Sequence, residues 1–247
     1  MEFRERDSQY ETQAQYEFAG AAAQETVIDN NGLAVYTAQV FGWMFAALLV
    51  TAGVSLGVLS SEELFHTVRG FVWPLIAVKF FLVFMFAASV HRMSAPIAGI
   101  CFFTYSVATG LWLSIILAMY TATSAANVFM ITAGTFGIMA VYGITTKKNL
   151  TSMGSILYTA LIGVILAIVL NLFLFQSSMI SLIVSCFAVF IFTGLIAYNA
   201  QRIRQTYMNG MESTSEGQKY AMFAAFSLYL DFVCLFVHLL QLLGDRE

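Results

Sequence analysis

Two long stretches of this chain contain no charged residue. Residues 93–146 form a run of 54 positions and residues 149–201 a run of 53, and neither run contains Asp, Glu, Lys or Arg. A helix that spans a bilayer needs about 20 apolar residues, so each run holds two spans and a turn. Ten-residue segments of alternating polarity, which a membrane barrel requires, are missing, so the spanning elements are predicted to be helices.

The composition supports the same class of protein. Hydrophobic residues make up 60% of the 247 positions and charged residues 10%, whereas a soluble domain has about 25% charged residues. These proportions exclude a soluble enzyme, a nucleic-acid-binding protein and a secreted domain held by disulfides. Cys101, Cys186 and Cys234 lie in apolar segments, so we expect free thiols that pack as small hydrophobic groups.

Apolar windows between charged or turn-forming breaks predict seven membrane-spanning helices, and the fold class is therefore all-α and polytopic. The predicted spans are 34-59, 71-90, 97-120, 127-146, 155-175, 178-200 and 220-243. The connections are short except for residues 201-219, which we interpret as a flexible cytoplasmic loop. In the fourth span, Ala133, Gly134 and Gly137 are predicted to allow the close approach of a neighbouring helix.

The distribution of basic residues predicts the orientation, because basic loops remain in the cytoplasm. Eight bases fall on the side of the amino terminus and two on the opposite side. The eight are Arg4, Arg6, Arg92, Lys147, Lys148, Arg202, Arg204 and Lys219, and the two are Arg69 and Arg246. We therefore expect the amino terminus in the cytoplasm and, with an odd number of spans, the carboxyl terminus outside.

Residues 1-33 form a separate acidic segment. Seven acids and two bases give this segment a charge of -5, and Gln, Asn and Ala fill much of the remainder. Since the segment has no sustained apolar stripe, it is predicted to be a disordered cytoplasmic tail. Residues 34-247 then form the seven-helix transmembrane domain.

Two charged side chains, Lys79 and Asp231, lie inside the predicted spans. A charge near the centre of a membrane helix costs about 2.5 to 3.5 kcal/mol on insertion scales. The long stem of Lys79 can reach toward an interface, so interfacial placement or pairing competes with a role in transport. Asp231 falls at the midpoint of the last span and has a short stem. We interpret it as functional, the alternative being a neutral, hydrogen-bonded carboxyl group.

Asp231 belongs to a polar stripe along the last span. Spacings of 4, 3, 4 and 3 residues place its members within about 80° of one another on the helix surface. The members are Ser227, Asp231, Cys234, His238 and Gln241. Such a stripe faces protein or water, and ordinary polar packing within a bundle is the alternative to function. His238 by itself is more often a hydrogen-bonded histidine than a proton carrier.

The sixth span carries a second polar face, formed by Ser181, Ser185 and Asn199. Asn199 is predicted to mark the cytoplasmic end of this helix, beside Arg202 and Arg204. A polar helix terminus is the simpler interpretation of Asn199.

Signatures of catalysis are absent from the sequence. It contains no His-Glu-x-x-His, no cluster of His and carboxylates for a metal, no Gly-x-Ser-x-Gly and no P-loop. We therefore expect no enzymatic activity, no cofactor and no nucleic-acid partner.

Several ordered motifs carry a resemblance to a known family. They are YTAQVFGWM at 36–44, TAGTFG at 132–137, YGITTKK at 142–148, GLIAYNAQRI at 194–203, SLYLDF at 227–232 and LLG at 242–244. Together they resemble the bacterial branch of the Bax inhibitor-1 family, and the likeness covers nearly all of 34-244. The resemblance implies seven helices with the last one central and enclosed by the other six, and a pH-sensitive leak of Ca²⁺ down its gradient. Other bacterial members bind and restrain a membrane-anchored ATP-dependent protease.

The resemblance also implies a functional pair. The family's pH sensor consists of two aspartates, one in a Tyr-Leu-Asp motif that matches Asp231 and one in a Tyr-Asp-Thr-Gln motif. At the second position this chain has Asn199, followed by Ala200. Two close carboxylates share a proton because both cannot ionise cheaply, and this coupling cannot arise here. Asn199 can still exchange a hydrogen bond with Asp231.

The leading hypothesis is a Ca²⁺ leak channel or transporter in a bacterial cytoplasmic (inner) membrane, with altered pH sensing. The expected ion pathway and gate contain Asp231, Asn199, Arg202, His238 and Ser227. Asp231 would be a weak Ca²⁺ ligand, and Arg202 a candidate electrostatic latch. The expected partners are the lipid bilayer and Ca²⁺. The alternative is an interaction protein that engages a membrane-anchored protease, or another membrane partner, through its helices and acidic tail.

Overall fold

The computed structural model describes residues 30–89, 93–208 and 215–246. The predicted acidic tail therefore lies outside the described residues, except for its last four positions. By its internal contacts the chain divides into two units, Met1–Val35 and Tyr36–Glu247. The second unit contains the membrane bundle, which is described here.

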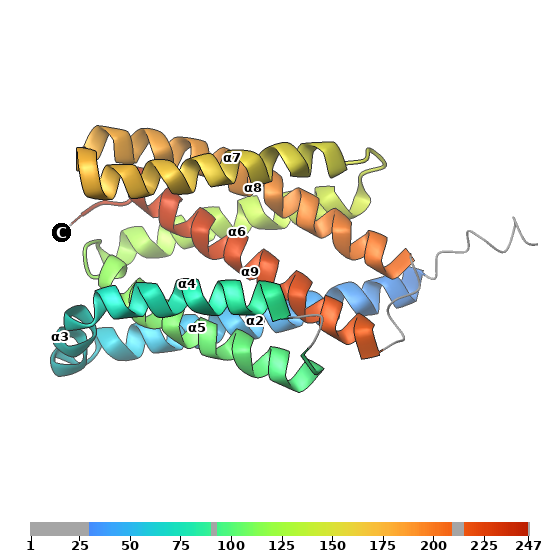
Figure 1. The fold of residues 1–247 in the computed structure, drawn as a ribbon, viewed down its shortest axis with the longest axis horizontal. Helices are drawn as coiled ribbons and strands as arrows, with labels where there is room; N and C mark the ends of the chain where they lie inside the picture. Colours follow the sequence, from blue (N-terminus) through green and yellow to red (C-terminus); the bar gives the residue numbers. More distant parts are fainter. Residues whose placement is uncertain (1–29, 90–92, 209–214, 247) are drawn as a thin grey trace, which may run out of the picture. The chain divides into compact units, whose positions relative to one another are not determined.

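Within these described ranges the chain is helical apart from short connections and one isolated β-bridge between Tyr120 and Arg246. The helices, shown in Figure 1, are α2 (Asn30–Leu59), α3 (Glu62–Gly70), α4 (Val72–Ser89), α5 (Ala95–Leu117), α6 (Ala122–Thr145), α7 (Thr151–Leu170), the π-helical turn η1 (Asn171–Phe175), α8 (Ser178–Met208) and α9 (Ser215–Leu243). The predicted all-α fold is confirmed.

Six of the described helices are long and apolar enough to cross a membrane: α2, α5, α6, α7 with η1, α8 and α9. Helices α3 and α4 meet at a bend of 69°, and counting this pair as one span gives seven. The short helix α3 was not predicted. Ser61 caps its start, because the Ser61 hydroxyl accepts a hydrogen bond from the Leu64 backbone N–H. The helix has acidic residues in its first turn and Arg69 in its last. These features stabilise a helix that is too polar to span.

The predicted loop at 201-219 is largely wrong, because α8 continues to Met208. The Gln201 side chain explains the extension. Its amide nitrogen donates to the Lys148 carbonyl at 2.7 Å, and its amide oxygen accepts from the Leu150 N–H at 2.8 Å. A polar residue that pairs two backbone groups of the α6–α7 connection is therefore part of the packed bundle.

Close packing of α6 occurs at a different glycine from those predicted. A Cβ atom built on Gly134 or Gly137 would meet no atom within 4 Å. A Cβ on Gly143 would overlap the backbone carbonyl group of Ala197 in α8. The backbones of α6 and α8 approach closely at Gly143, so only glycine fits there.

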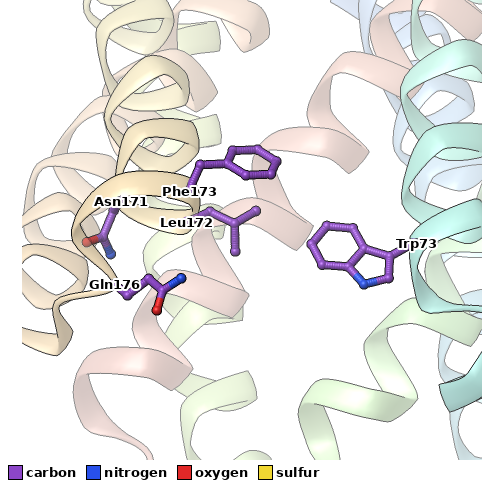
Figure 2. A pocket seen from close by; sticks show the side chains of 5 residues that line it. All are labelled: Trp73, Asn171, Leu172, Phe173 and Gln176. Atoms are coloured by element: carbon purple, nitrogen blue, oxygen red, sulfur yellow. The ribbon is translucent and has the colours of Figure 1, made fainter.

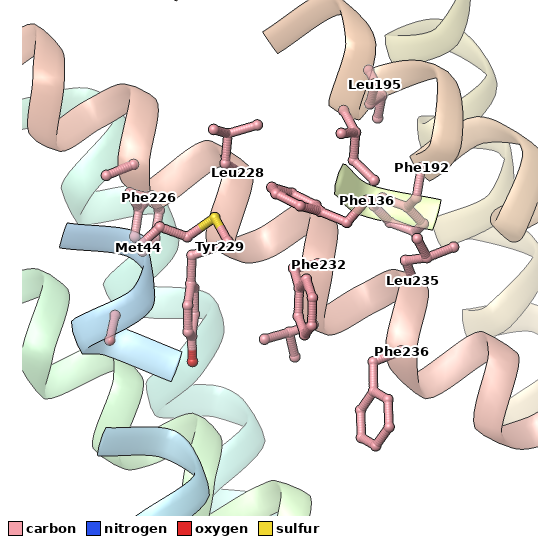
Figure 3. Packing of buried hydrophobic residues seen from close by; sticks show 14 of the residues in the cluster. Met44, Phe136, Phe192, Leu195, Phe226, Leu228, Tyr229, Phe232, Leu235 and Phe236 are labelled. Atoms are coloured by element: carbon pink, nitrogen blue, oxygen red, sulfur yellow. The ribbon is translucent and has the colours of Figure 1, made fainter. Parts of the chain in front are cut away.

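Helix α9 is the most buried of the candidate spans. In its most apolar window 61% of the residues are buried, compared with 6% in α7. Figure 3 shows its aromatic and leucine side chains packed among those of α2, α6 and α8. Its side chains contact Thr51 of α2, Phe86 of α4, Phe102 of α5 and Phe136 of α6. This arrangement agrees with the expected central position of the last helix, while α7 packs on α8.

Candidate ion site within the membrane

Asp231 and Asn199 meet inside the bundle. Asp231 lies in the middle of α9 and is 5% exposed, and Asn199 lies on α8 and is 4% exposed. The amide Nδ2 of Asn199 donates a hydrogen bond of 2.7 Å to Oδ2 of Asp231. Helix α8 continues for nine residues beyond Asn199, so the predicted position of Asn199 at the end of the helix is wrong. The two residues paired by the resemblance are in direct contact.

A third side chain fixes the direction of this contact. The hydroxyl of Tyr158 in α7 donates to Oδ1 of Asn199 at 3.3 Å. With its oxygen engaged by a donor, the Asn199 amide presents its NH₂ group to the carboxylate. The Tyr158 side chain is 40% exposed, so a short polar chain links the buried carboxylate to the outer surface of α7.

Burial in a membrane bundle gives this pair its chemical character. A carboxylate taken out of water is costly unless hydrogen bonds or a cation compensate it. The amide supplies one charge-assisted hydrogen bond to Asp231 but no charge. The ionised carboxylate therefore retains a net negative potential that attracts a cation.

Arg202 and Ser227 lie near this pair but do not bond to it. Arg202 is exposed and forms no ion pair with Asp231; its guanidinium carbon lies 5.7 Å from the centre of the Phe223 ring. The Ser227 hydroxyl donates to the Phe223 carbonyl of its own helix at 3.0 Å.

His238 belongs to a second polar cluster between α8 and α9. Its Nδ1 lies 3.2 Å from the Ser185 hydroxyl, and its ring stacks on Phe192 with centroids 6.0 Å apart. The Ser185 hydroxyl in turn donates to the amide oxygen of Gln241. The NH₂ group of Gln241 donates to the Ser181 hydroxyl at 2.9 Å. Three members of the α9 stripe, Asp231, His238 and Gln241, thus contact the polar face of α8, in two clusters along one interface.

Lys79, the second charge within the predicted spans, points toward α5. Its ammonium nitrogen lies 3.9 Å from the centre of the Trp112 ring and 5.7 Å from that of Tyr105. Cys234, one turn beyond Asp231 on α9, is a free thiol, as are Cys101 and Cys186, in agreement with the prediction.

A shallow depression of about 480 Å³ lies elsewhere, between the start of α4 and the turn that follows α7. Figure 2 shows the residues that line it, which are Trp73, Asn171, Leu172, Phe173 and Gln176. None of these side chains is charged, and the Asn171 amide bonds to both backbone groups of Ser177. The depression therefore offers no charged side chain to a cation.

Sequence reasoning missed Tyr158 and Trp112 as neighbours of the two intramembrane charges. Each lies in an apolar window, and spacing along one helix does not reveal contacts with another. The one available signal is chemical, since the Tyr hydroxyl and the aromatic face are groups that stabilise charges in apolar surroundings.

Comparison with known proteins places this arrangement in a family. Residues 33–247 match the family described as "Inhibitor of apoptosis-promoting Bax1". Inner membrane protein YbhL of Escherichia coli (strain K12) is 41% identical over 220 residues, which are 87% of this chain and 94% of that protein. A protein of Rickettsia prowazekii is 38% identical over 221 residues, which are 88% of this chain and 92% of that protein. A protein of Borreliella burgdorferi is 37% identical over 228 residues, which are 91% of this chain and 96% of that protein. The chain therefore belongs to the Bax inhibitor-1 family.

Proposed function

We propose that the protein is a Ca²⁺ leak channel or transporter of the bacterial inner membrane, with Asp231 as the carboxylate of the ion pathway. One observation carries the proposal: a buried carboxylate in the most buried span is bonded to a neutral amide. The name of the Escherichia coli relative supports the inner membrane as the location. The proposal includes no enzymatic activity and no resident cofactor.

The expected Ca²⁺ site is weak. Ca²⁺ takes six to eight oxygen ligands, and Asp231 supplies one carboxylate, while the Asn199 amide oxygen already accepts from Tyr158. The Asn199 N–H group occupies one carboxylate oxygen, so an arriving ion competes with it. A hydrogen bond to a charged group contributes about 1.5 to 3 kcal/mol. Brief binding of this kind suits passage better than storage.

The other predicted residues would flank this point. Ser227 and His238 lie one and two turns from Asp231 along α9. Arg202 lies one turn beyond Asn199 and would act as the latch by moving its guanidinium from Phe223 toward Asp231. With only one carboxyl group in the pair, the response to pH should be a single protonation step rather than a coupled one.

The proposed orientation has the amino terminus in the cytoplasm and the carboxyl terminus outside. A reporter enzyme that is active only outside the cytoplasm should therefore be active when fused after Glu247. Activity of a cytoplasmic reporter at that position would contradict seven spans with this orientation.

Ca²⁺ flux in proteoliposomes tests the proposal. Asp231→Asn keeps the shape of the side chain and removes its charge, so flux should fall about tenfold or more, equivalent to about 1.4 kcal/mol at the barrier. Asp245→Asn is the matched control, because Asp245 is exposed and makes its hydrogen bonds through the backbone. Normal flux through folded Asp231→Asn would refute the assignment of Asp231.

The alternative is an interaction protein for a membrane-anchored ATP-dependent protease. It predicts no flux in proteoliposomes made with the wild-type protein. It also predicts that such a protease is recovered in pull-downs and is lost when residues 1-33 are deleted.

A further inference from the structure

The depression beside the start of α4 has apolar walls and lies at the end of two membrane spans. Its walls are formed by Trp73, in the first turn of α4, and by Leu172 and Phe173 of η1, which ends the span of α7. Figure 2 shows Leu172 and Phe173 on the side of η1 that faces Trp73. Spans end where the hydrocarbon core meets the lipid headgroups, so the depression lies at that depth of the bilayer.

The apolar walls of the depression belong to the outer surface of the bundle. Trp73, Leu172 and Phe173 are 59%, 48% and 68% exposed. The exposed surface continues along α7, since only 6% of the most apolar window of the α7–η1 span is buried. An exposed apolar surface of this extent marks contact with the membrane. The depression is therefore continuous with the lipid-facing surface of α7.

The course of α4 explains why the surface is hollow at this point. Near the end of α4, Phe86 is 1% exposed, and its ring packs on that of Phe226 in α9 with centroids 4.4 Å apart. At the start of α4, Trp73 is exposed instead and faces η1 across the depression. One end of α4 is thus packed on the central helix, while the other end leaves a space beside η1.

Two side-chain N–H donors of the depression have no hydrogen-bond partner in the part of the chain that the structure describes. They are the indole N–H of Trp73 and the carboxamide NH₂ of Gln176. The backbone of Gln176 is held in place, because its N–H donates to the Asn171 carbonyl at 2.7 Å. The Asn171 amide, in contrast, is fully engaged by the backbone of Ser177. The depression therefore offers apolar walls and two free donors to an amphiphilic ligand.

We propose that the depression binds one phospholipid of the surrounding membrane. An acyl chain packs against Trp73, Leu172 and Phe173, and the ester or phosphate oxygens accept from the free donors of Trp73 and Gln176. The volume of about 480 Å³ is typical of small-molecule sites and accommodates part of a lipid. Because no lining side chain is charged, the site recognises the groups that all phospholipids share rather than the charge of one headgroup. This inference does not depend on ion flux, since it concerns the lipid-facing surface.

Native mass spectrometry of the detergent-extracted protein counts the lipids that it retains. The wild type should keep one phospholipid after excess detergent has removed the rest. Leu172→Trp should keep none, because the larger ring fills the depression. Leu166→Trp is the matched control, since Leu166 is 57% exposed on α7 and does not line the depression. Trp73→Phe removes one donor and should weaken lipid binding about two- to tenfold, the value of one neutral hydrogen bond, whereas Trp43→Phe should not.

A lipid titration provides an independent measurement. A ligand that binds the folded state raises the melting temperature in a concentration-dependent manner. Phosphatidylethanolamine and phosphatidylglycerol, added separately to the delipidated wild type, should both raise it until the site is saturated. Leu166→Trp should respond in the same way, and Leu172→Trp should show no saturable rise.

Three results would overturn the inference. Equal lipid retention by the wild type and folded Leu172→Trp would place the lipid elsewhere, and if Leu172→Trp does not fold, unweakened binding by Trp73→Phe has the same meaning. Stabilisation by phosphatidylglycerol alone would show recognition of headgroup charge, which this depression cannot provide. A lipid-free wild-type dimer that Leu172→Trp dissociates would assign the surface to a second copy of the chain. None of these results bears on Ca²⁺ flux, which tests the proposed function separately.

Discussion

Replacing Asn199 with aspartate is the sharpest test of the Asn199–Asp231 pair. In the structure the Asn199 nitrogen that would become a carboxylate oxygen lies 2.7 Å from Oδ2 of Asp231. Asn199→Asp therefore exchanges a hydrogen bond for two carboxyl groups in contact, both in a buried site. Such a pair must hold one shared proton whenever the second ionisation is too costly.

The cost follows from the geometry. Two carboxylates whose oxygens nearly touch place their charges about 4 Å apart, and their repulsion at an effective dielectric constant of 20 is about 4 kcal/mol. At 1.36 kcal/mol per pH unit, the two protons should leave in steps about three pH units apart. The wild type has one carboxyl group in the pair and should respond to pH in a single step.

The assay is Ca²⁺ flux in proteoliposomes between about pH 5 and 8, where a shifted carboxyl group can act as a switch. Asn199→Asp should show a pH-dependent closure that the wild type lacks or shows weakly. Asn149→Asp is the matched control, since Asn149 is exposed and its Oδ1 is an acceptor that aspartate retains. The same pH profile for the wild type and Asn199→Asp would refute this reasoning.

Three further predictions concern the stability of the bundle in detergent. Gly143→Ala should destabilise it by about 1 to 3 kcal/mol, because the new methyl group meets the Ala197 backbone. The control Gly137→Ala should be neutral or slightly stabilising, because its methyl group meets no atom. Equal melting temperatures of the two variants would contradict the close approach of α6 and α8 at Gly143. Gln201→Leu should lower the free energy of unfolding by about 2 to 4 kcal/mol, because it leaves the Lys148 carbonyl and the Leu150 N–H unpaired. A decrease below about 1 kcal/mol would mean that water replaces the amide as their partner. Deletion of residues 1-30 should leave the melting temperature almost unchanged, because the tail has little apolar area to contribute, and a large drop would show that it packs on the bundle.

The hydropathy of the chain predicts which segments cross the membrane but not where each helix ends. Helix α8 passes the predicted limit of 200 because Gln201 and Arg204 find backbone acceptors at the end of α6 and in the connection that follows it. A scale that assigns polar residues to water cannot anticipate partners from another helix. The same reason explains why α3 was missed, since its stability comes from local capping and charge rather than from an apolar run.

The candidate site was only partly visible in the sequence. Asp231 could be found from its depth alone, because a short acidic side chain in the middle of a span requires an explanation. Asn199 was identified through the family resemblance, and its partner Tyr158 was not identified at all. Lys79 was found, but its direction was not, because a long stem permits either the interface or the interior and only the position of Trp112 decides between them.

The position of α9 in the chain has a consequence for biosynthesis. Helix α9, which has the largest buried share of the candidate spans, leaves the ribosome after the other described helices. Chains fold from the amino terminus during synthesis, so the earlier helices must enter the membrane before the segment that fills their centre exists. Until α9 has been synthesised, Thr51, Phe102 and Asn199 lack the α9 side chains that they contact in the folded bundle. The nascent protein therefore passes through a stage in which lipid, water or an insertion factor must occupy the place of α9.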